Sequence, residues 1–296
     1  MASASSAPNQ RKPAWLRMKP PRPSEAESVL KTLQTFGLET VCREARCPNA
    51  LDCHARGTAT FMILGAICTR ACRFCNVATG RPEALDLTEP ARLALAVQRL
   101  GLRHCVITSV DRDDLPDFGA AHFAHCIRAV HHKNPDCTIE VLTPDFNGRL
   151  AAIEEVVAAR PDVFNHNLET VPRLSPGIRP KADYRQSLQI LQFVKQLDPA
   201  VTTKSGVMVG LGERPDEVVP VLEDMRAHGV EIVTIGQYLS PTPRHAAVAR
   251  YVPPAEFAEW ARIARELGFA HAFCGPLVRS SFHADEVFAT AHAATF

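Results

Sequence analysis

The chain has 296 residues and a formal net charge of +1, with 46% hydrophobic and 22% charged residues. A chain of this length can bury a sizeable core, either as one large α/β domain or as two smaller domains. The near-zero net charge gives no electrostatic argument for a nucleic-acid partner. The longest apolar runs are far shorter than the ~20 residues that a membrane-spanning helix needs. We therefore expect neither a nucleic-acid-binding nor a membrane protein.

The cysteine content and the first residues bear on the compartment. Ten cysteines in a chain this long fall short of the density of a disulfide scaffold, so we expect reduced thiols and a reducing compartment. Residues 1–23 carry five basic residues, five prolines and no acid. This composition resembles a transit peptide, but the prolines prevent the amphipathic helix that transit peptides form. We interpret residues 1–23 as an extended basic arm, with docking of an acidic partner as the alternative, and expect a bacterial cytoplasmic rather than a mitochondrial protein.

The apolar pattern predicts a helix first and then alternating strands and helices. Residues 24–38 have helical spacing, with Ser24 as a candidate N-cap and Gly37 as a stop. The expected strands are 59–66, 104–110, 138–142, 162–167, 202–209 and 231–238, with a seventh candidate at 270–274. The expected helices are 89–101, 119–132, 149–159, 183–197, 215–228 and 254–267. Alternation at this period predicts parallel βαβ units with right-handed crossovers, whose ligand site lies at the carboxyl ends of the strands.

Three cysteines directly follow the first expected strand, in the sequence Cys68-Thr-Arg-Ala-Cys72-Arg-Phe-Cys75. Three thiolates at this spacing can bind three irons of a four-iron cube and leave the fourth iron open for chemistry. The alternative is a structural zinc site, which usually has four protein ligands. The nearest further cysteine, Cys53, belongs to another group, so the spacing favours the iron–sulfur cluster.

A second group of cysteines lies just upstream, with Cys42, Cys47 and Cys53 in the pattern C-x4-C-x5-C. Six of the ten cysteines thus fall between residues 42 and 75. Metal ligands must converge on one point, whereas buried structural cysteines scatter with the core, so this clustering predicts metal binding. The remaining cysteines occupy apolar positions and are interpreted as core packing: Cys105, Cys126, Cys137 and Cys274.

Polar residues lie at the ends of several expected strands, where burial without partners is costly and a ligand is therefore expected. They are Thr108, Ser109 and residues 111–114 after the second strand, Asn165, His166, Asn167 and Glu169 at the fourth, Lys204 and Ser205 in the fifth, and Gln237 and Tyr238 at the sixth. Asp113 or Asp114 could instead pair with Arg112 or satisfy backbone groups. His166 could equally be a satisfied core histidine.

The two cysteine motifs together resemble a known family. C-x3-C-x2-C is the signature of the radical SAM superfamily, and C-x4-C-x5-C ahead of it is similar to the second-cluster motif of lipoyl synthases. The similarity runs from about residue 11 to about residue 285. The stretches that carry it are 11–17, 46–49, 56–65, 111–116, 165–170, 204–206 and 279–282.

The resemblance implies an α/β fold, a partial (β/α)6 TIM-type barrel with N-terminal and C-terminal extensions that carry a second iron–sulfur cluster. We expect one compact domain in four parts. The arm 1–23 is followed by an extension, 24–57, with the auxiliary-cluster cysteines. The radical SAM barrel spans 58–275, and a C-terminal extension, 276–296, contains an Arg-Ser-Ser motif.

The implied activity is insertion of two sulfur atoms at carbons 6 and 8 of an octanoyl chain held on a lysine of a carrier protein. The resemblance assigns Cys68, Cys72 and Cys75 to a four-iron cluster that cleaves S-adenosylmethionine to a 5′-deoxyadenosyl radical. A second four-iron cluster, the sulfur donor, would be held by Cys42, Cys47, Cys53 and Ser281, with Ser280 as the alternative to Ser281. The expected S-adenosylmethionine contacts are Ser109, Asn167, Glu169 and Lys204.

The resemblance also implies partners. They are an octanoylated lipoyl-carrier protein, such as the lipoyl domain of a 2-oxoacid dehydrogenase or the glycine-cleavage H protein, an electron donor such as ferredoxin or flavodoxin, and a cluster-repair protein. The chain departs from the family pattern at Phe282, where tyrosine is usual, and at His54, where tryptophan is common. The alternatives are another radical SAM sulfur-inserting enzyme, a non-enzymatic two-cluster electron carrier and a zinc-stabilised binding module.

Overall fold

The computed structural model describes residues 11–17, 23–41, 47, 49, 53 and 60–281. Residues outside these ranges include Cys42, His54 and Phe282, so the predictions for these three concern positions that are not described. Within the expected extended arm, Ala14–Leu16 form a 3-10 helix, η1, in which the apolar Leu16 is buried. The first α-helix, α1, spans Pro23–Phe36 and lies close to its expected place.

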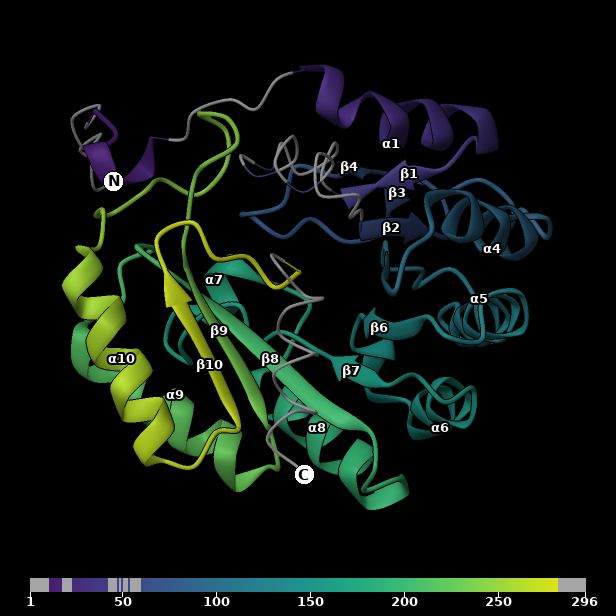
Figure 1. The fold of residues 1–296 in the computed structure, drawn as a ribbon. Helices are drawn as coiled ribbons and strands as arrows, with labels where there is room; N and C mark the ends of the chain where they lie inside the picture. Colours follow the sequence, from purple (N-terminus) through teal and green to yellow (C-terminus); the bar gives the residue numbers. More distant parts are fainter. Residues whose placement is uncertain are drawn as a thin grey trace.

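An eight-stranded sheet forms the centre of the molecule (Figure 1), with the order β1-β2-β5-β6-β7-β8-β9-β10. The strands are β1 Glu39–Thr40, β2 Thr60–Ile63, β5 His104–Ser109, β6 Thr138–Leu142, β7 Val163–Asn165, β8 Thr202–Val209, β9 Ile232–Gln237 and β10 His271–Gly275. Strand β1 pairs antiparallel with β2, and all other neighbours pair in parallel. The order does not close β10 onto β1 within the described residues, so the sheet is a partial barrel.

Six helices connect successive parallel strands and cover the outside of the sheet (Figure 1). They are α4 Glu89–Leu100, α5 Ala120–Lys133, α6 Leu150–Ala158, α8 Tyr184–Leu197, α9 Pro215–Ala227 and α10 Pro254–Glu266. The expected helices and strands, including the seventh strand at the C-terminal end, are confirmed. The elements that sequence reasoning missed are short: β1, β3 Ile67–Cys68, β4 Ala78–Thr79, the 3-10 helix η2 Phe146–Gly148 and α7 Ser175–Ile178.

The central strands are largely buried because helices cover the outer face and side chains fill the inner one, whereas β10 at the edge of the sheet is half-buried throughout. All residues of β2 and β9 are buried. Helix α8 joins the two main groups of core side chains, since Val194 packs in one and Leu191 in the other. The core-packing interpretation is confirmed for Cys105, Cys126 and Cys137, which are all buried.

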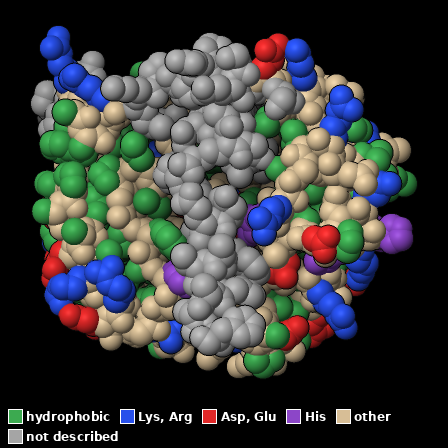
Figure 2. Space-filling model, viewed as in Figure 1, with side chains coloured by type: hydrophobic (Ala, Val, Ile, Leu, Met, Phe, Trp, Pro, Cys, Tyr) green, Lys and Arg blue, Asp and Glu red, His purple; other side chains and the backbone are tan. Residues whose placement is uncertain are grey.

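The surface agrees with the small net charge. Figure 2 shows basic and acidic side chains interspersed over the described part of this face. None of the described helices combines the length and the apolar character that a bilayer-spanning helix requires.

A buried ion pair connects three strands inside the barrel. Lys204 Nζ of β8 lies 2.9 Å from both carboxylate oxygens of Glu140 of β6, and each side chain is 1% exposed. Asn165 of β7 donates its Nδ2–H to Glu140 Oε1 at 2.9 Å. Burial alone would raise the pKa of Glu140, but Lys204 and His104 outweigh burial and hold its pKa below the ordinary value.

We expect Glu140→Gln to lower the free energy of unfolding by about 3–5 kcal/mol, because it leaves the Lys204 ammonium buried without a counter-charge. Urea unfolding at neutral pH measures this loss. Because the folded-state pKa of Glu140 is depressed, its stabilisation is present above the unfolded-state pKa and declines as the pH falls toward the folded-state value. The difference between variant and wild type should therefore shrink in acid.

The matched control is Glu155→Gln, which removes a carboxylate from an exposed pair with Arg128. Its expected cost is under about 1 kcal/mol. Equal, small losses in both variants would show that the buried pair has no special role.

Candidate functional site

The three cysteines of the C-x3-C-x2-C motif lie on a loop whose two ends are fixed together. Leu64 and Gly65, with φ of 69° and 92°, turn the chain out of β2. Strand β3 then pairs in parallel with β4. Gly80 N–H donates to the Cys68 carbonyl at 3.0 Å, and Cys75 N–H donates to the Cys72 carbonyl at 3.0 Å. The loop between β3 and β4 therefore presents all three thiols to one cavity, which they line.

Burial keeps these thiols protonated when no metal is bound. It raises the pKa of Cys72 to about 12 and that of Cys75 to about 11, and the nearby Asp111 carboxylate adds to both shifts. The pKa of Cys68 is raised for the same two reasons. Metal ligation requires thiolates, so cluster binding would release these protons.

The cavity lies at the carboxyl ends of β5, β6 and β7, where parallel strands are expected to bind ligands. Besides the cysteines it is lined by polar residues from successive strand ends: Thr108 and Ser109 at the end of β5 and Asp111 after it, Thr143 and Asp145 after β6, and His166, Asn167 and Glu169 after β7. Arg179, at the end of α7, adds a cation.

Three buried polar atoms of this cavity lack a hydrogen-bond partner among the described residues. They are Ser109 Oγ, Thr143 Oγ1 and Asn167 Oδ1. Buried polar atoms are nearly always partnered by protein, water or ligand. Their convergence on the cavity that the three thiols line indicates a bound polar molecule beside the metal ligands.

Glu169 is held in the cavity wall by a strained backbone. Its φ is 66°, a value that non-glycine residues rarely adopt. Two hydrogen bonds to β8 fix it, because Glu169 N–H donates to the Gly206 carbonyl at 3.0 Å and Met208 N–H donates to the Glu169 carbonyl at 2.8 Å. Burial raises the pKa of its carboxyl, an effect that Arg179 and a hydrogen bond from Asn167 partly offset.

His166 is satisfied at both ring nitrogens and still forms part of the wall. Nδ1 lies 3.0 Å from the Thr143 carbonyl, which can only accept, so Nδ1 carries the proton. Burial and then Arg179 lower the pKa of His166 to about 4, which leaves Nε2 as an acceptor at neutral pH. Nε2 is 3.0 Å from Ser187 Oγ, a hydroxyl that also lies 3.0 Å from the Asp183 carbonyl. The structure thus favours the satisfied-histidine interpretation of His166.

Three of the four expected S-adenosylmethionine contacts, Ser109, Asn167 and Glu169, line the same cavity. Lys204 does not line it, because its ammonium is occupied by the buried Glu140. Of the two aspartates with alternative interpretations, Asp114 pairs with Arg112 at 2.9 Å.

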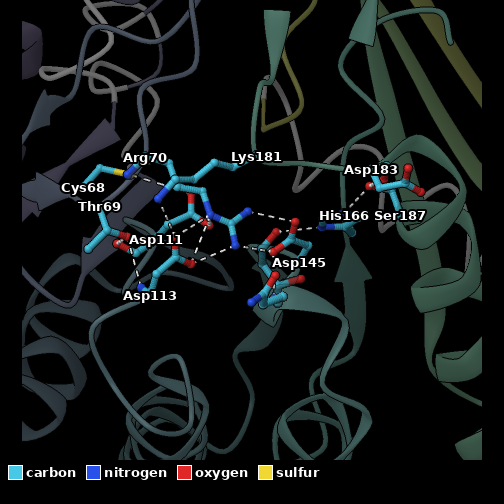
Figure 3. A network of polar contacts seen from close by, with 12 residues as sticks. Cys68, Thr69, Arg70, Asp111, Asp113, Asp145, His166, Lys181, Asp183 and Ser187 are labelled. Atoms are coloured by element: carbon cyan, nitrogen blue, oxygen red, sulfur yellow. Dashed lines mark hydrogen bonds and ion pairs between the residues drawn. The ribbon is translucent and has the colours of Figure 1, made fainter. Parts of the chain in front are cut away.

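Asp113 belongs to a network that sequence reasoning missed, shown in Figure 3. Arg70, between the first two cysteines of the motif, reaches three carboxylates from two strand ends. Its Nη2 lies 2.8 Å from Asp113 and 2.7 Å from Asp145, and its Nε lies 3.3 Å from Asp111. The signal in the sequence was a basic residue inside a cysteine motif and acidic residues at the next strand ends, but nothing showed that they meet.

The described parts of the two extensions meet at the end of β9. Asn49 is fully buried and donates its Nδ2–H to the Leu277 carbonyl at 2.8 Å. The half-buried Arg279 interacts electrostatically with Cys47 through its guanidinium. A Cβ on Gly236 would lie 2.1 Å from the Val278 carbonyl oxygen, so the C-terminal segment can approach β9 this closely only over a glycine.

The second metal site is described only in part. Cys47 and Cys53 are half-buried and form no disulfide, and Cys53 N–H donates to the Asn49 carbonyl at 2.9 Å. Ser280 and Ser281 are half-buried at the C-terminal limit of the described chain. Within the described ranges, no three His, Cys, Asp or Glu side chains converge as a single metal ion requires. A four-iron cube is larger, and each of its ligands binds a different iron.

Comparison with known proteins gives the relationships of the chain. The sequence profile of the Radical SAM superfamily matches residues 62–225. A lipoyl synthase from Rubrobacter xylanophilus is 56% identical over 275 residues, which is 93% of this chain and 86% of that protein. A lipoyl synthase from Methylococcus capsulatus is 57% identical over 277 residues, with the same coverage of 93% and 86%.

Solved structures show the same fold at low sequence identity. The FeFe-hydrogenase maturase HydG from Carboxydothermus hydrogenoformans superimposes with a TM-score of 0.55 at 14% identity, covering 92% of this chain and 78% of that one. Methylornithine synthase superimposes with a TM-score of 0.54 at 12% identity, covering 81% and 76%. These similarities confirm the mainly parallel, partial-barrel architecture.

We expect Gly236→Ala to displace residues 277–279, because the added Cβ would collide with the Val278 carbonyl. Hydrogen exchange should become faster at the Val278 amide, which donates to the Gly275 carbonyl at 3.1 Å. Gly177→Ala is the control, since a Cβ there meets nothing within 4 Å. An unchanged exchange rate in Gly236→Ala would mean that the close approach does not hold the segment in place.

Proposed function

The chain belongs to the lipoyl synthase family of the radical SAM superfamily, and on this premise we propose how its two cysteine groups divide the reaction. The enzyme is a sulfurtransferase that inserts two sulfur atoms, at carbons 6 and 8 of a protein-bound octanoyl chain. One observation supports the division most directly. The three cysteines of the C-x3-C-x2-C motif line the same cavity as three residues that carry buried, unpartnered polar atoms.

Cys68, Cys72 and Cys75 are the proposed ligands of the radical-generating cluster. When bound, this cluster supplies the electron that cleaves S-adenosylmethionine to a 5′-deoxyadenosyl radical. The cavity has acidic and basic side chains for the charged groups of the ligand, namely the carboxyls of Asp111 and Glu169, whose pKa values burial raises, and the Arg179 guanidinium. Its unpartnered atoms on Ser109, Thr143 and Asn167 offer hydrogen bonds to polar groups of the same ligand.

The walls of this cavity keep other reactions out. Enzymes that use radicals must exclude water and competing hydrogen donors from the reacting atoms. The neutral His166 is held by Thr143 and Ser187, so both its nitrogens are occupied. The strained Glu169 is fixed by the hydrogen bonds that its backbone N–H and its carbonyl both make with β8. These residues form a wall that needs no reorganisation when the ligand binds.

Cys42, Cys47 and Cys53, together with Ser281, are the proposed ligands of the auxiliary cluster. Supporting this assignment, Cys47 lies within electrostatic reach of Arg279, two residues before Ser281, and Asn49 binds the Leu277 carbonyl. A serine oxygen is a harder ligand than a thiolate, so the iron it binds is the one most easily lost. A cluster with one weakly held iron suits the role of sulfur donor.

The proposed substrate is an octanoylated carrier protein, either a lipoyl domain of a 2-oxoacid dehydrogenase or a glycine-cleavage H protein. A ferredoxin or flavodoxin supplies electrons, and a cluster-repair protein restores the consumed cluster. None of the nine cysteines within the described residues is in a disulfide, which suits the reducing bacterial cytoplasm in which we place the enzyme.

The division of labour is tested by removing each cluster separately. We expect Cys72→Ala to abolish 5′-deoxyadenosine formation, because the radical-generating cluster loses one of three ligands. The triple variant Cys42/Cys47/Cys53→Ala should retain roughly half the iron of the wild type, as for one four-iron cluster instead of two. It should still form 5′-deoxyadenosine, but no carbon–sulfur bond. Iron analysis, chromatography of 5′-deoxyadenosine and mass spectrometry of the carrier measure these outcomes.

The two variants control for each other, since both remove cluster-binding cysteines and only one removes radical formation. Undiminished 5′-deoxyadenosine in Cys72→Ala would contradict the assignment of the first cluster. Thiolated carrier from the triple variant would show that the sulfur comes from elsewhere.

Ser281→Ala should leave 5′-deoxyadenosine formation largely intact and suppress the dithiolated product, because only the auxiliary cluster loses a ligand. Ser280→Ala is the matched control at the neighbouring residue and should behave like the wild type. The same phenotype in Ser280→Ala alone would move the iron ligand by one residue.

A further inference from the structure

We propose that Arg70 is a positioning residue that keeps the radical-generating cluster reducible. It ties the cysteine loop to two strand ends and offsets the charge of the aspartates that surround the loop. This proposal rests on the assignment of Cys68, Cys72 and Cys75 to that cluster. It concerns a side chain that is not a metal ligand.

Arg70 attaches the loop to the barrel through two carboxylates at once. Its Nη1 donates to Asp145 Oδ2, after β6, at 2.8 Å, and its Nη2 lies 2.7 Å from the other oxygen of the same carboxylate. Its Nε and Nη2 donate to Asp113, after β5, at distances from 2.8 to 3.1 Å. The residue is 6% exposed. Such fork-shaped contacts fix orientation as well as distance, which a lysine cannot do.

The anchored side chain also fixes a backbone donor on a cysteine sulfur. The Arg70 N–H lies 3.4 Å from Cys68 Sγ, and Thr79 Oγ1 donates to the Arg70 carbonyl at 3.1 Å. The neighbouring Thr69 is held equally firmly, since its N–H and Oγ1–H both donate to the Asp111 carbonyl. Hydrogen bonds to ligand sulfurs raise the reduction potential of iron–sulfur clusters. Loosening Arg70 would weaken this bond.

The charges around Arg70 act in the same direction. Asp111, Asp113 and Asp145 all lie within 3.3 Å of the guanidinium, and Asp111 Oδ2 is 3.7 Å from Cys68 Sγ. The second cation of the network, Lys181, lies 3.6 Å from Asp113, but its side chain is 61% exposed and screened by solvent. Negative charge near a cluster lowers its reduction potential. Arg70 is therefore the buried cation that offsets the three carboxylates.

Arg112 provides a matched control. It is equally buried, at 3% exposed, and it also forks onto a carboxylate, that of Asp114, at 2.9 Å. Its remaining bonds go to the carbonyls of Leu64 and Glu83. If Arg70 only stabilised the fold, replacing either arginine would have the same effect.

The experiment compares Arg70→Met, Arg70→Lys and Arg112→Met in the full chain carrying Cys42/Cys47/Cys53→Ala, so that one cluster is observed. Iron analysis first checks that this background holds one four-iron cluster; its absence would refute the proposed function rather than the role of Arg70. Redox titration followed by electron paramagnetic resonance then gives the midpoint potential of the one-electron reduction.

With iron content retained, we expect Arg70→Met to have a more negative midpoint potential and slower 5′-deoxyadenosine formation. The rate should recover toward that of the background protein with a stronger reductant, which a merely structural defect would not allow. Arg112→Met should keep the background potential. An unshifted potential in Arg70→Met, or an equal shift in Arg112→Met, overturns the proposal.

Arg70→Lys keeps the positive charge but cannot make the two-pronged guanidinium contacts with the carboxylates. This variant tests the proposal if Arg70→Met fails to assemble a cluster. A potential more negative than that of the background protein, with a slowed reaction that the stronger reductant restores, supports the proposal. A lysine variant with the potential and rate of the background protein overturns it.

Discussion

Parallel strands bring their carboxyl ends to one edge of the sheet, and this constraint determines where the polar groups of the site lie. Ser109, Thr143 and Asn167 come from three different strand ends and face one cavity. The cysteine loop leaves β2 at the same edge, so thiols and polar atoms meet without any specialised subdomain. The cost of burying unpartnered groups there is recovered only when a ligand binds.

The same strands, a little deeper in the barrel, bury a fully paired charge. Lys204 and Glu140 satisfy each other, and Asn165 adds a third hydrogen bond. The two levels of the barrel interior therefore differ in character. The deeper level holds a buried ion pair, whereas the level above it is lined by the cysteine thiols and by polar side chains from three strand ends.

The sequence predicted the regular elements well because helices and buried strands have a periodic pattern. The ranges expected for β6 and β8 agree with the structure residue for residue. The apolar run 59–66 was predicted to be a single strand, but the chain turns at Leu64, which has a positive φ. A leucine side chain gives no sign of such a turn in the sequence. The two-residue strands β3 and β4 are too short to show the alternation of apolar and polar residues that predicts a strand.

The site was predictable where ligands are close in sequence and not where partners are distant. Spacing alone grouped Cys68, Cys72 and Cys75. The contact between Arg70 and Asp145 spans 75 residues, and that between Lys204 and Glu140 spans 64, so only the fold shows which carboxylate each cation meets. Lys204 was expected in the cavity because a strand position alone does not reveal its partner.

Close backbone approach at two glycines connects the cavity with the C-terminal segment. A small second pocket shares Asn167 and Glu169 with the main cavity and extends along Gly206 and Gly236 to Arg279. A Cβ at Gly206 would lie 2.4 Å from Thr234 Oγ1, and one at Gly236 would meet the Val278 carbonyl. The small pocket between the main cavity and Arg279 is therefore bordered by two strand positions at which a side chain would collide with its neighbours.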